Sequence, residues 1–268
     1  MTARSVRLFG CDIHALTMAE TLDEVERLVE ARTLAQHCVI NAAKAVAIGE
    51  DPALREIVRS CDLVNADGQA VVWASRLLGA PLPERVAGID LFEALLGRAE
   101  ARGWSVYFLG ARQHVVDEVV RRARVRHPRL RVAGWRNGYF GAAENTDVVA
   151  AIREAAPDIL FVGMPSPRKE YWLSENLEAL GVPFSMGVGG SFDVYAGLTQ
   201  RAPQWMQRLG LEWLYRFAQE PRRMWRRYLL GNVAFVRLVA REWRAGRAGR
   251  GGRGSGGFPP PASPRGER

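Results

Sequence analysis

Short apolar segments alternate with helix-length segments along most of this chain, and this alternation constrains the fold more than any other feature. Helices are expected between the apolar segments, for example over 115–127 and 169–180. Strands joined by helices of this length form a mainly parallel sheet covered on both faces. The sequence therefore predicts a Rossmann-like α/β fold. The strand candidates are residues 6–9, 38–40, 62–64, 104–109, 130–135, 159–162 and 183–186.

The first helix has a start signal in its sequence. Thr21 and Glu24 have the spacing of a capping box, in which each side chain bonds the other residue's backbone amide. A helix is therefore predicted to open at Thr21 and to run to about Ala31.

The ends of the predicted strands supply the candidate site residues. In open parallel sheets, ligands bind at the carboxyl ends of the strands. Asn41, Asp67 and the segments 163–170 and 187–193 occupy such positions. A carboxylate at position 67 could act as a general base toward a bound hydroxyl. It could equally cap the following helix, and position alone leaves both interpretations open.

Two further features carry weaker signals. The glycine-rich run 187–190 follows a strand and could surround a phosphate with backbone amides, although a tight structural turn is the commoner explanation. It is not a P-loop, because no Gly-Lys-Ser/Thr follows. Arg85 would suit a diphosphate. The four histidines have no ligand spacing and no Asp-x-Asp pair occurs, so no metal site or cofactor is predicted.

The charge is concentrated at the carboxyl-terminal end. Residues 1–200 carry 22 Lys and Arg against 25 Asp and Glu, whereas residues 201–268 carry 15 against 4. Such a distribution predicts a mildly acidic body brought to an anionic surface by a basic segment. The three cysteines are expected to be buried free thiols. Only two lysines occur, Lys44 and Lys169.

A helical wheel of the basic segment indicates which kind of anionic surface the segment would contact. If residues 222–244 form one helix, seven arginines fall within an arc of about 140° and aromatic and aliphatic residues lie opposite. That pattern is typical of a helix in a membrane interface. The alternative is a helix whose apolar face packs on the body. An exposed apolar face would also allow self-association into a homo-oligomer.

Three regions are expected. Residues 1–200 form the catalytic α/β domain, residues 201–244 a basic helical membrane-docking appendage, and residues 245–268 a disordered Gly/Arg/Pro tail. No stretch approaches 18 uninterrupted apolar residues, and the amino terminus has no apolar signal-peptide core. A cytoplasmic chain, peripheral on the membrane, is therefore expected.

Taken together, these segments resemble the WecG/TagA/CpsF family of glycosyltransferases over about residues 6–230. The matching motifs, in the family's order, are Asn41, Ala66-Asp67-Gly68, Arg85, Gly88-Ile89-Asp90-Leu91, Gly138-Tyr139-Phe140, Pro167-Arg168-Lys169-Glu170, the run 187–193, Arg201-Ala202-Pro203, the run 210–216 and Glu220-Pro221-Arg222.

The resemblance implies an inverting, metal-independent transferase acting at the inner membrane face. Such enzymes move N-acetylmannosamine or a related hexose from a UDP-sugar to a polyprenyl-diphosphate-linked sugar for a surface polysaccharide. It implies Asp67 as the base and Arg85 as the group that stabilises a diphosphate. The substrate-binding residues it implies are Asn41, Lys44, Lys169, Glu170, Gly187, Gly189, Gly190, Asp193 and, in the appendage, Arg216, Arg222 and Arg223.

The chain departs from the family pattern around its two lysines. Many members have Thr where this chain has Val39, and Gln where it has Lys169. A more usual Asn-Pro-Glu is replaced by the run that begins at Asn41 and ends at Lys44. These departures suggest a donor other than N-acetylmannosamine, such as glucose or an anionic sugar.

Two other classes of protein remain open at this point. A binding protein on the same fold would hold a UDP-sugar or a membrane partner without turnover. An RNA-binding protein would use the arginines of 222–253 and the Arg-Gly tail. The ordered wheel and the family resemblance argue against nucleic acid as a partner.

Overall fold

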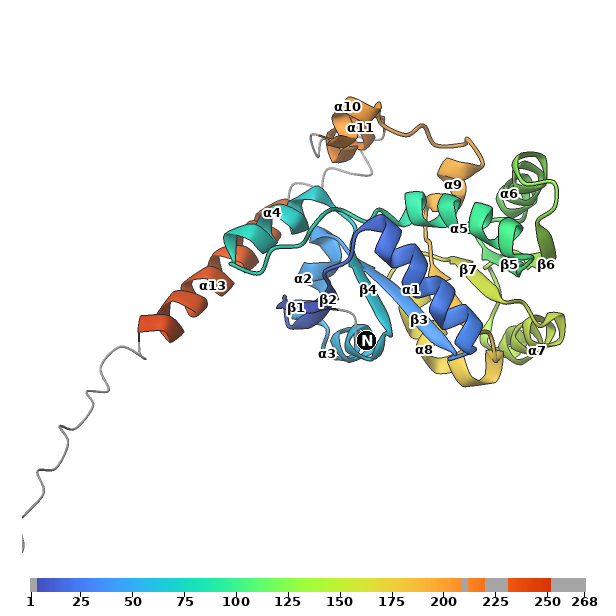
Figure 1. Ribbon diagram of the computed structural model, residues 1–268, viewed down its shortest axis with the longest axis horizontal. Coiled ribbons are helices and arrows are strands. Elements are labelled where there is room, and N and C mark those ends of the chain that lie inside the picture. The colour runs from blue at the N-terminus through green and yellow to red at the C-terminus, as the bar shows by residue number, and fades with distance from the viewer. Residues whose placement is uncertain (1–3, 209–211, 220–230, 252–268) are drawn as a thin grey trace, which may run out of the picture.

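One parallel sheet organises the computed structural model, which describes residues 4–208, 212–219 and 231–251 (Figure 1). The strand order is β4-β3-β8-β7-β5-β6, and every neighbouring pair is parallel. All six carboxyl ends therefore lie at one edge, and the predicted mainly parallel α/β fold is confirmed. The strands are β3 (Ala35–Ile40), β4 (Leu63–Ala66), β5 (Ser105–Gly110), β6 (Arg131–Arg136), β7 (Ile159–Gly163) and β8 (Phe184–Gly187).

Helices cover both faces of the sheet, because successive side chains of a strand point to opposite sides. Phe108 of β5 packs in one apolar cluster with helices α1, α5, α6 and α9. Its neighbours Tyr107 and Leu109 pack in another with α7 and α8. A third cluster joins β3 and β4 to α2, α3 and α4. The helices are α1 (Met18–Ala31), α2 (Ala42–Glu50), α3 (Pro52–Ser60), α4 (Gln69–Leu77), α5 (Gly88–Arg102), α6 (Gln113–Arg126), η1 (Ala142–Glu144), α7 (Asn145–Ala155), α8 (Arg168–Leu180) and α9 (Ser191–Tyr195).

The first helix begins one turn earlier than predicted. Thr17 is its N-cap and forms the capping box with Glu20. Thr21 is instead buried inside the helix, where its hydroxyl accepts a hydrogen bond from Asn65 at 3.1 Å. Two Thr-x-x-Glu sequences, 17–20 and 21–24, follow one another directly here, so the local signature did not identify the helix start.

A hairpin lies against the edge strand β4. Strands β1 (Ser5–Leu8) and β2 (Cys11–His14) are antiparallel, and Phe9 and Gly10 between them both have positive φ, as two-residue hairpin turns require. The backbone amide of Val64 in β4 donates to His14 Nδ1 at 3.0 Å. The hairpin thereby covers part of an otherwise open edge.

The carboxyl-terminal segments form α10 (Gln204–Arg208), α11 (Glu212–Gln219) and α13 (Gly231–Gly251). Helix α13 packs on α2. Its Phe235 and Val239 are buried in the third cluster, and the Phe235 ring lies 5.5 Å from that of Phe9. The apolar face predicted for membrane contact therefore packs on the body in this segment. The helix also continues past Arg244, where the disordered tail was expected to begin.

The outward side of α13 remains basic. Arg237, Arg241 and Arg244 are exposed, together with Val233 and Val236. At 100° per residue these five positions span about 140° of the helix, opposite the buried pair. Among the described helices, none combines the length and the apolar character that crossing a bilayer requires.

Candidate functional site

A cavity of about 950 Å³ lies along the carboxyl edge of the sheet in the described part of the chain. The ends of β3, β4, β5, β7 and β8 all contribute to its walls. Segments that are distant in sequence therefore converge on one space. The predicted site residues that line it are Asn41, Lys44, Asp67, Lys169, Gly187, Gly189, Gly190 and Asp193.

Asp67 lies directly after β4, half-buried at the cavity wall. Its backbone amide donates to the Ile40 carbonyl at 2.9 Å, which continues the strand pairing. Helix α4 has Gly68 as its N-cap and no side-chain cap, so the capping interpretation of Asp67 is wrong. A Cβ added at Gly88, the first residue of α5, would lie 3.8 Å from Asp67 Oδ2. The amino-terminal end of α5 thus approaches this carboxylate, which stabilises negative charge there.

Asn41 is the N-cap of α2, and its Oδ1 accepts from the Lys44 backbone amide at 3.0 Å. A Cβ added at Gly68 would lie 3.7 Å from Asn41 Cβ, so Asn41 adjoins the turn that carries Asp67. The cap fixes Asn41 at the cavity wall beside the candidate base.

Both lysines are buried beside one carboxylate behind the cavity wall. Lys44, Lys169 and Glu170 are 5%, 8% and 2% exposed. Glu170 Oε1 accepts a hydrogen bond from Lys44 Nζ and lies 3.3 Å from Lys169 Nζ, while Oε2 accepts from Ser166 Oγ at 2.9 Å. Lys44 Nζ also donates to Cys38 Sγ at 3.3 Å. Glu170 does not line the cavity; it holds the two lysines that do.

The pKa values of this cluster are strongly displaced. Burial raises the pKa of Glu170, but the two ammonium groups outweigh burial and hold it at about 2. Burial lowers the pKa of Lys44, but Cys38 and Glu170 outweigh burial and raise it. Burial has the largest effect on Lys169 and lowers its pKa, and the nearby Lys44 charge lowers that pKa further. A hydrogen bond with Cys61 and the Lys44 charge lower the pKa of Cys38 to about 6 against the opposing effect of burial.

Replacing Glu170 by glutamine is expected to lower the free energy of unfolding by about 3–5 kcal/mol, because it leaves two buried ammonium groups without their carboxylate. The folded-state pKa of about 2 lies below the unfolded value of about 4.3. The stabilisation is therefore present above the unfolded value and is lost as the pH falls toward the folded one. Urea unfolding at neutral and acidic pH measures it. Equal stability of wild type, Glu170→Gln and the exposed control Glu154→Gln would contradict the expectation.

The glycine run after β8 lies over Lys169. A Cβ added at Gly187 would come within 2.7 Å of Lys169 Cε, too close for any side chain. Gly189 has φ +54°, and a Cβ there would lie 3.4 Å from Lys169 Nζ. A side chain at 187 would therefore displace the buried Lys169 side chain, a reason for glycine that the sequence did not reveal. The three cysteines are buried and free, as predicted.

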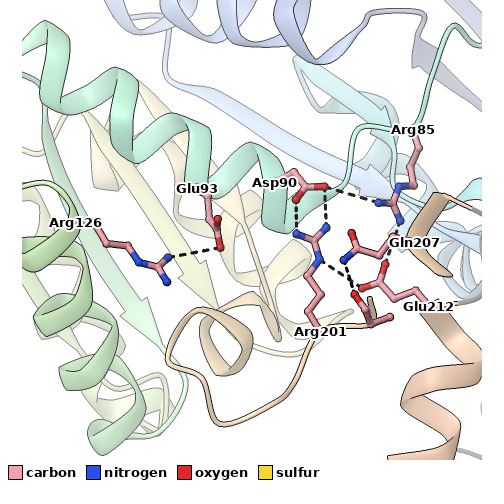
Figure 2. Close-up of polar contacts among 8 residues, drawn as sticks. Arg85, Asp90, Glu93, Arg126, Arg201, Gln207 and Glu212 are labelled. Carbon is pink, nitrogen blue, oxygen red and sulfur yellow. Dashed lines mark hydrogen bonds and ion pairs between the residues drawn. The ribbon is translucent and has the colours of Figure 1, made fainter. Parts of the chain in front are cut away.

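Arg85 is held in a four-residue ion cluster at the junction with the appendage (Figure 2). Its guanidinium lies 3.1 Å from Glu212 Oε2 and 3.8 Å from Asp90 Oδ2. Arg201 binds the same Asp90 through both of its oxygens, at 2.5 and 2.8 Å. Arg201 Nε also lies 4.0 Å from Glu212 Oε1. Two guanidinium groups therefore share two carboxylates.

Arg85 itself is not among the residues that line the cavity, whereas Glu212 is. The sequence reasoning did not single out Glu212, Asp90 and Arg201, which form the ion cluster with Arg85. All three lie in motifs that carried the family resemblance, but no local pattern indicated that they would meet. His114, which has no ligand spacing in the sequence, also lines the cavity.

Of the three arginines predicted for the site in the appendage, one lies within the described residues. Arg216 belongs to α11, which also supplies Glu212 to the cavity wall. Arg222 and Arg223 lie outside the described residues. Among the described residues, no group of three or more His, Cys, Asp and Glu side chains could hold a metal ion.

Comparison with known proteins gives one consistent result. A family model described as "Glycosyl transferase WecG/TagA/CpsF family" matches residues 6–249. The N-acetylglucosaminyldiphosphoundecaprenol N-acetyl-beta-D-mannosaminyltransferase of Bacillus spizizenii is 35% identical over 196 residues, 73% of this chain and 75% of the relative. The protein of the same name from Bacillus subtilis (strain 168) is 36% identical over 190 residues, 71% of this chain and 73% of the relative.

Proposed function

This chain belongs to the WecG/TagA/CpsF family of glycosyltransferases, and we propose that it transfers N-acetylmannosamine or a related hexose from a UDP-sugar to a polyprenyl-diphosphate-linked sugar. The observation that carries this proposal is the position of Asp67, half-buried in a large cavity at the carboxyl edge of the sheet. The names of both relatives include an undecaprenyl-diphosphate-linked sugar, which supports a lipid-linked acceptor.

In the proposed reaction, Asp67 takes the proton of the acceptor hydroxyl. The acceptor oxygen attacks the anomeric carbon from the face opposite the diphosphate. As the new bond forms, the bond between that carbon and the diphosphate oxygen breaks and UDP leaves. The configuration at the carbon is inverted, and the protein's own cations stabilise the departing charge in place of a metal ion.

Arg85 is the proposed source of that stabilisation. Its guanidinium is engaged by the carboxylate of Glu212, which lines the cavity. A diphosphate is a stronger partner for a guanidinium than a single carboxylate because it carries more charge and more acceptor oxygens. Substrate is expected to displace Glu212 from Arg85, with Arg216, Arg222 and Arg223 of the appendage as further cations.

Residues 1–200 would then act as the catalytic domain and residues 201–244 as an appendage that docks on the inner face of the cytoplasmic membrane. Support comes from the exposed side of α13, where Arg237, Arg241 and Arg244 flank Val233 and Val236. Basic residues around a few apolar ones suit an anionic lipid surface.

Replacing Arg237, Arg241 and Arg244 together by glutamine is expected to weaken binding to anionic vesicles by about 100-fold, since each arginine near such a surface contributes about 1 kcal/mol. Vesicle flotation measures this change. The control replaces three exposed arginines of α6, Arg121, Arg124 and Arg126. If both triple variants bind vesicles equally well, α13 is not the docking surface.

The deciding experiment for the proposed function measures UDP release. Purified protein on vesicles, without added metal, is offered polyprenyl-diphosphate-N-acetylglucosamine and a panel of UDP-sugars. Release that requires both a donor and the lipid acceptor is expected. Donor binding without release, from folded and vesicle-bound protein, would favour a binding protein. Salt-sensitive RNA binding that is much tighter than vesicle binding would favour a nucleic-acid partner.

A further inference from the structure

The charges around the buried lysines are unevenly compensated. Lys44 has both Glu170 and the Cys38 sulfur as partners. Lys169 has Glu170 as its one recorded polar partner among the described residues, at 3.3 Å. Glu170 already receives hydrogen bonds from Lys44 and Ser166. A buried ammonium group normally needs fuller compensation, because removing it from water is costly.

The Lys169 ammonium also faces the cavity. Its side chain lines the cavity, and its Nζ lies beneath Gly189, where the absent side chain leaves space. Because Lys169 packs against the end of β8 and Asp67 follows β4, two strand spacings separate them across the sheet, or roughly 10 Å. A sugar and its substituents can span that interval.

We propose that Lys169 is an oxyanion-binding residue of this cavity, which takes either the carboxylate of an acidic donor sugar or the diphosphate of the nucleotide. Glu170 positions the ammonium, and the glycine run allows an anionic group to approach it. The anionic ligand then supplies the negative charge that the buried Lys169 ammonium group needs beside Glu170. Burial and the Lys44 charge lower the pKa of Lys169, and an anion bound beside its ammonium group would favour the charged form. This inference rests on the proposed function for its choice of ligands.

The test measures by calorimetry how tightly small anionic and uncharged probes bind to the full-length wild-type protein and to its variants Lys169→Gln and Lys169→Met. Glutamine keeps a polar group of similar reach, and methionine keeps only the apolar stem. Arg153→Gln removes one charge from an exposed position on α7, away from the cavity, and is the matched control. The probes are uridine, UDP, UDP-N-acetylmannosamine, its uronate counterpart and inorganic diphosphate. Melting curves establish that each variant is folded.

Loss of a charged hydrogen bond should weaken anion binding by about 10- to 100-fold. If the anion is a sugar carboxylate, wild type prefers the uronate donor, and both Lys169 variants lose that preference while UDP binds as before. If the anion is the diphosphate, UDP and both donors weaken equally and uridine is unaffected. Either result supports the proposal.

Other outcomes separate this inference from the proposed function. Equal binding of every probe by wild type and both Lys169 variants, with turnover intact, would overturn the inference alone. Diphosphate binding that requires Lys169, with no binding of any uridine compound, would keep the anion site and reject the nucleotide-sugar function. Absence of binding by any probe would overturn both.

Discussion

Asp67→Asn is expected to lower kcat for sugar transfer by about 10²- to 10⁴-fold, the contribution of a positioned general base. Asparagine keeps the size and the hydrogen-bonding reach of the side chain but cannot accept the proton of the acceptor hydroxyl. Donor binding should remain, because the cavity walls are unchanged. Steady-state UDP release with the lipid acceptor measures kcat, and calorimetry measures donor affinity.

Asp62→Asn is the control for this variant. Asp62 precedes the same strand at its opposite end, where its carboxylate accepts from the Gln36 backbone amide at 2.9 Å. It is expected to retain turnover. Near-normal kcat in purified Asp67→Asn would remove Asp67 from the role of base, and an equal loss in both variants would indicate damage to β4 instead.

Arg85→Gln is expected to lower kcat by about 10²- to 10³-fold, which is typical when one preorganised group that stabilises developing charge is removed. The Arg85 side chain is only 16% exposed, so its charge acts where solvent screens it weakly. Arg85→Lys should restore only part of the rate, because an ammonium group cannot offer the planar pair of donors. The measurement is UDP release under saturating donor and acceptor.

The matched control is Arg98→Gln. Arg98 lies on α5 and is also engaged by two carboxylates, those of Glu26 and Asp23, but neither carboxylate lines the cavity, whereas the Arg85 partner Glu212 does. Its loss should affect stability more than turnover. If Arg85→Gln turns over as fast as Arg98→Gln, the assignment of diphosphate stabilisation to Arg85 fails.

The ion cluster also bears on how the appendage and the body cooperate. Glu212 of α11 contacts Arg85, which the family resemblance assigns to the diphosphate. A ligand that takes over Arg85 would release this contact and free α11 to adjust. Substrate binding and the position of the appendage are therefore expected to be coupled through a single carboxylate.

Several elements were predictable from local sequence. Strand and helix periodicity identified the parallel α/β fold, and the rule on strand ends identified Asn41, Asp67 and the glycine run as neighbours of one cavity. The start of α1 was misplaced because two equivalent capping sequences follow one another directly, and the structure distinguishes them: Thr17 caps the helix, whereas Thr21 pairs with Asn65. The wheel over 222–244 separated an arginine side, which the described residues 231–244 of α13 share, but it could not tell whether the apolar side meets lipid or protein.

The sequence by itself determined the order of the elements, the edge of the sheet where the cavity lies and the sign of the carboxyl-terminal charge, because each depends on residues close together in the chain. The tertiary structure alone decided the pairings. Lys44 meets Glu170 across 126 positions, and Arg85 meets Glu212 across 127. Periodicity describes which face of an element is apolar, whereas the partner of a buried charge depends on how distant elements pack. For that reason Lys169 appeared in the sequence only as a departure from a motif, and in the structure as an ammonium group facing the cavity.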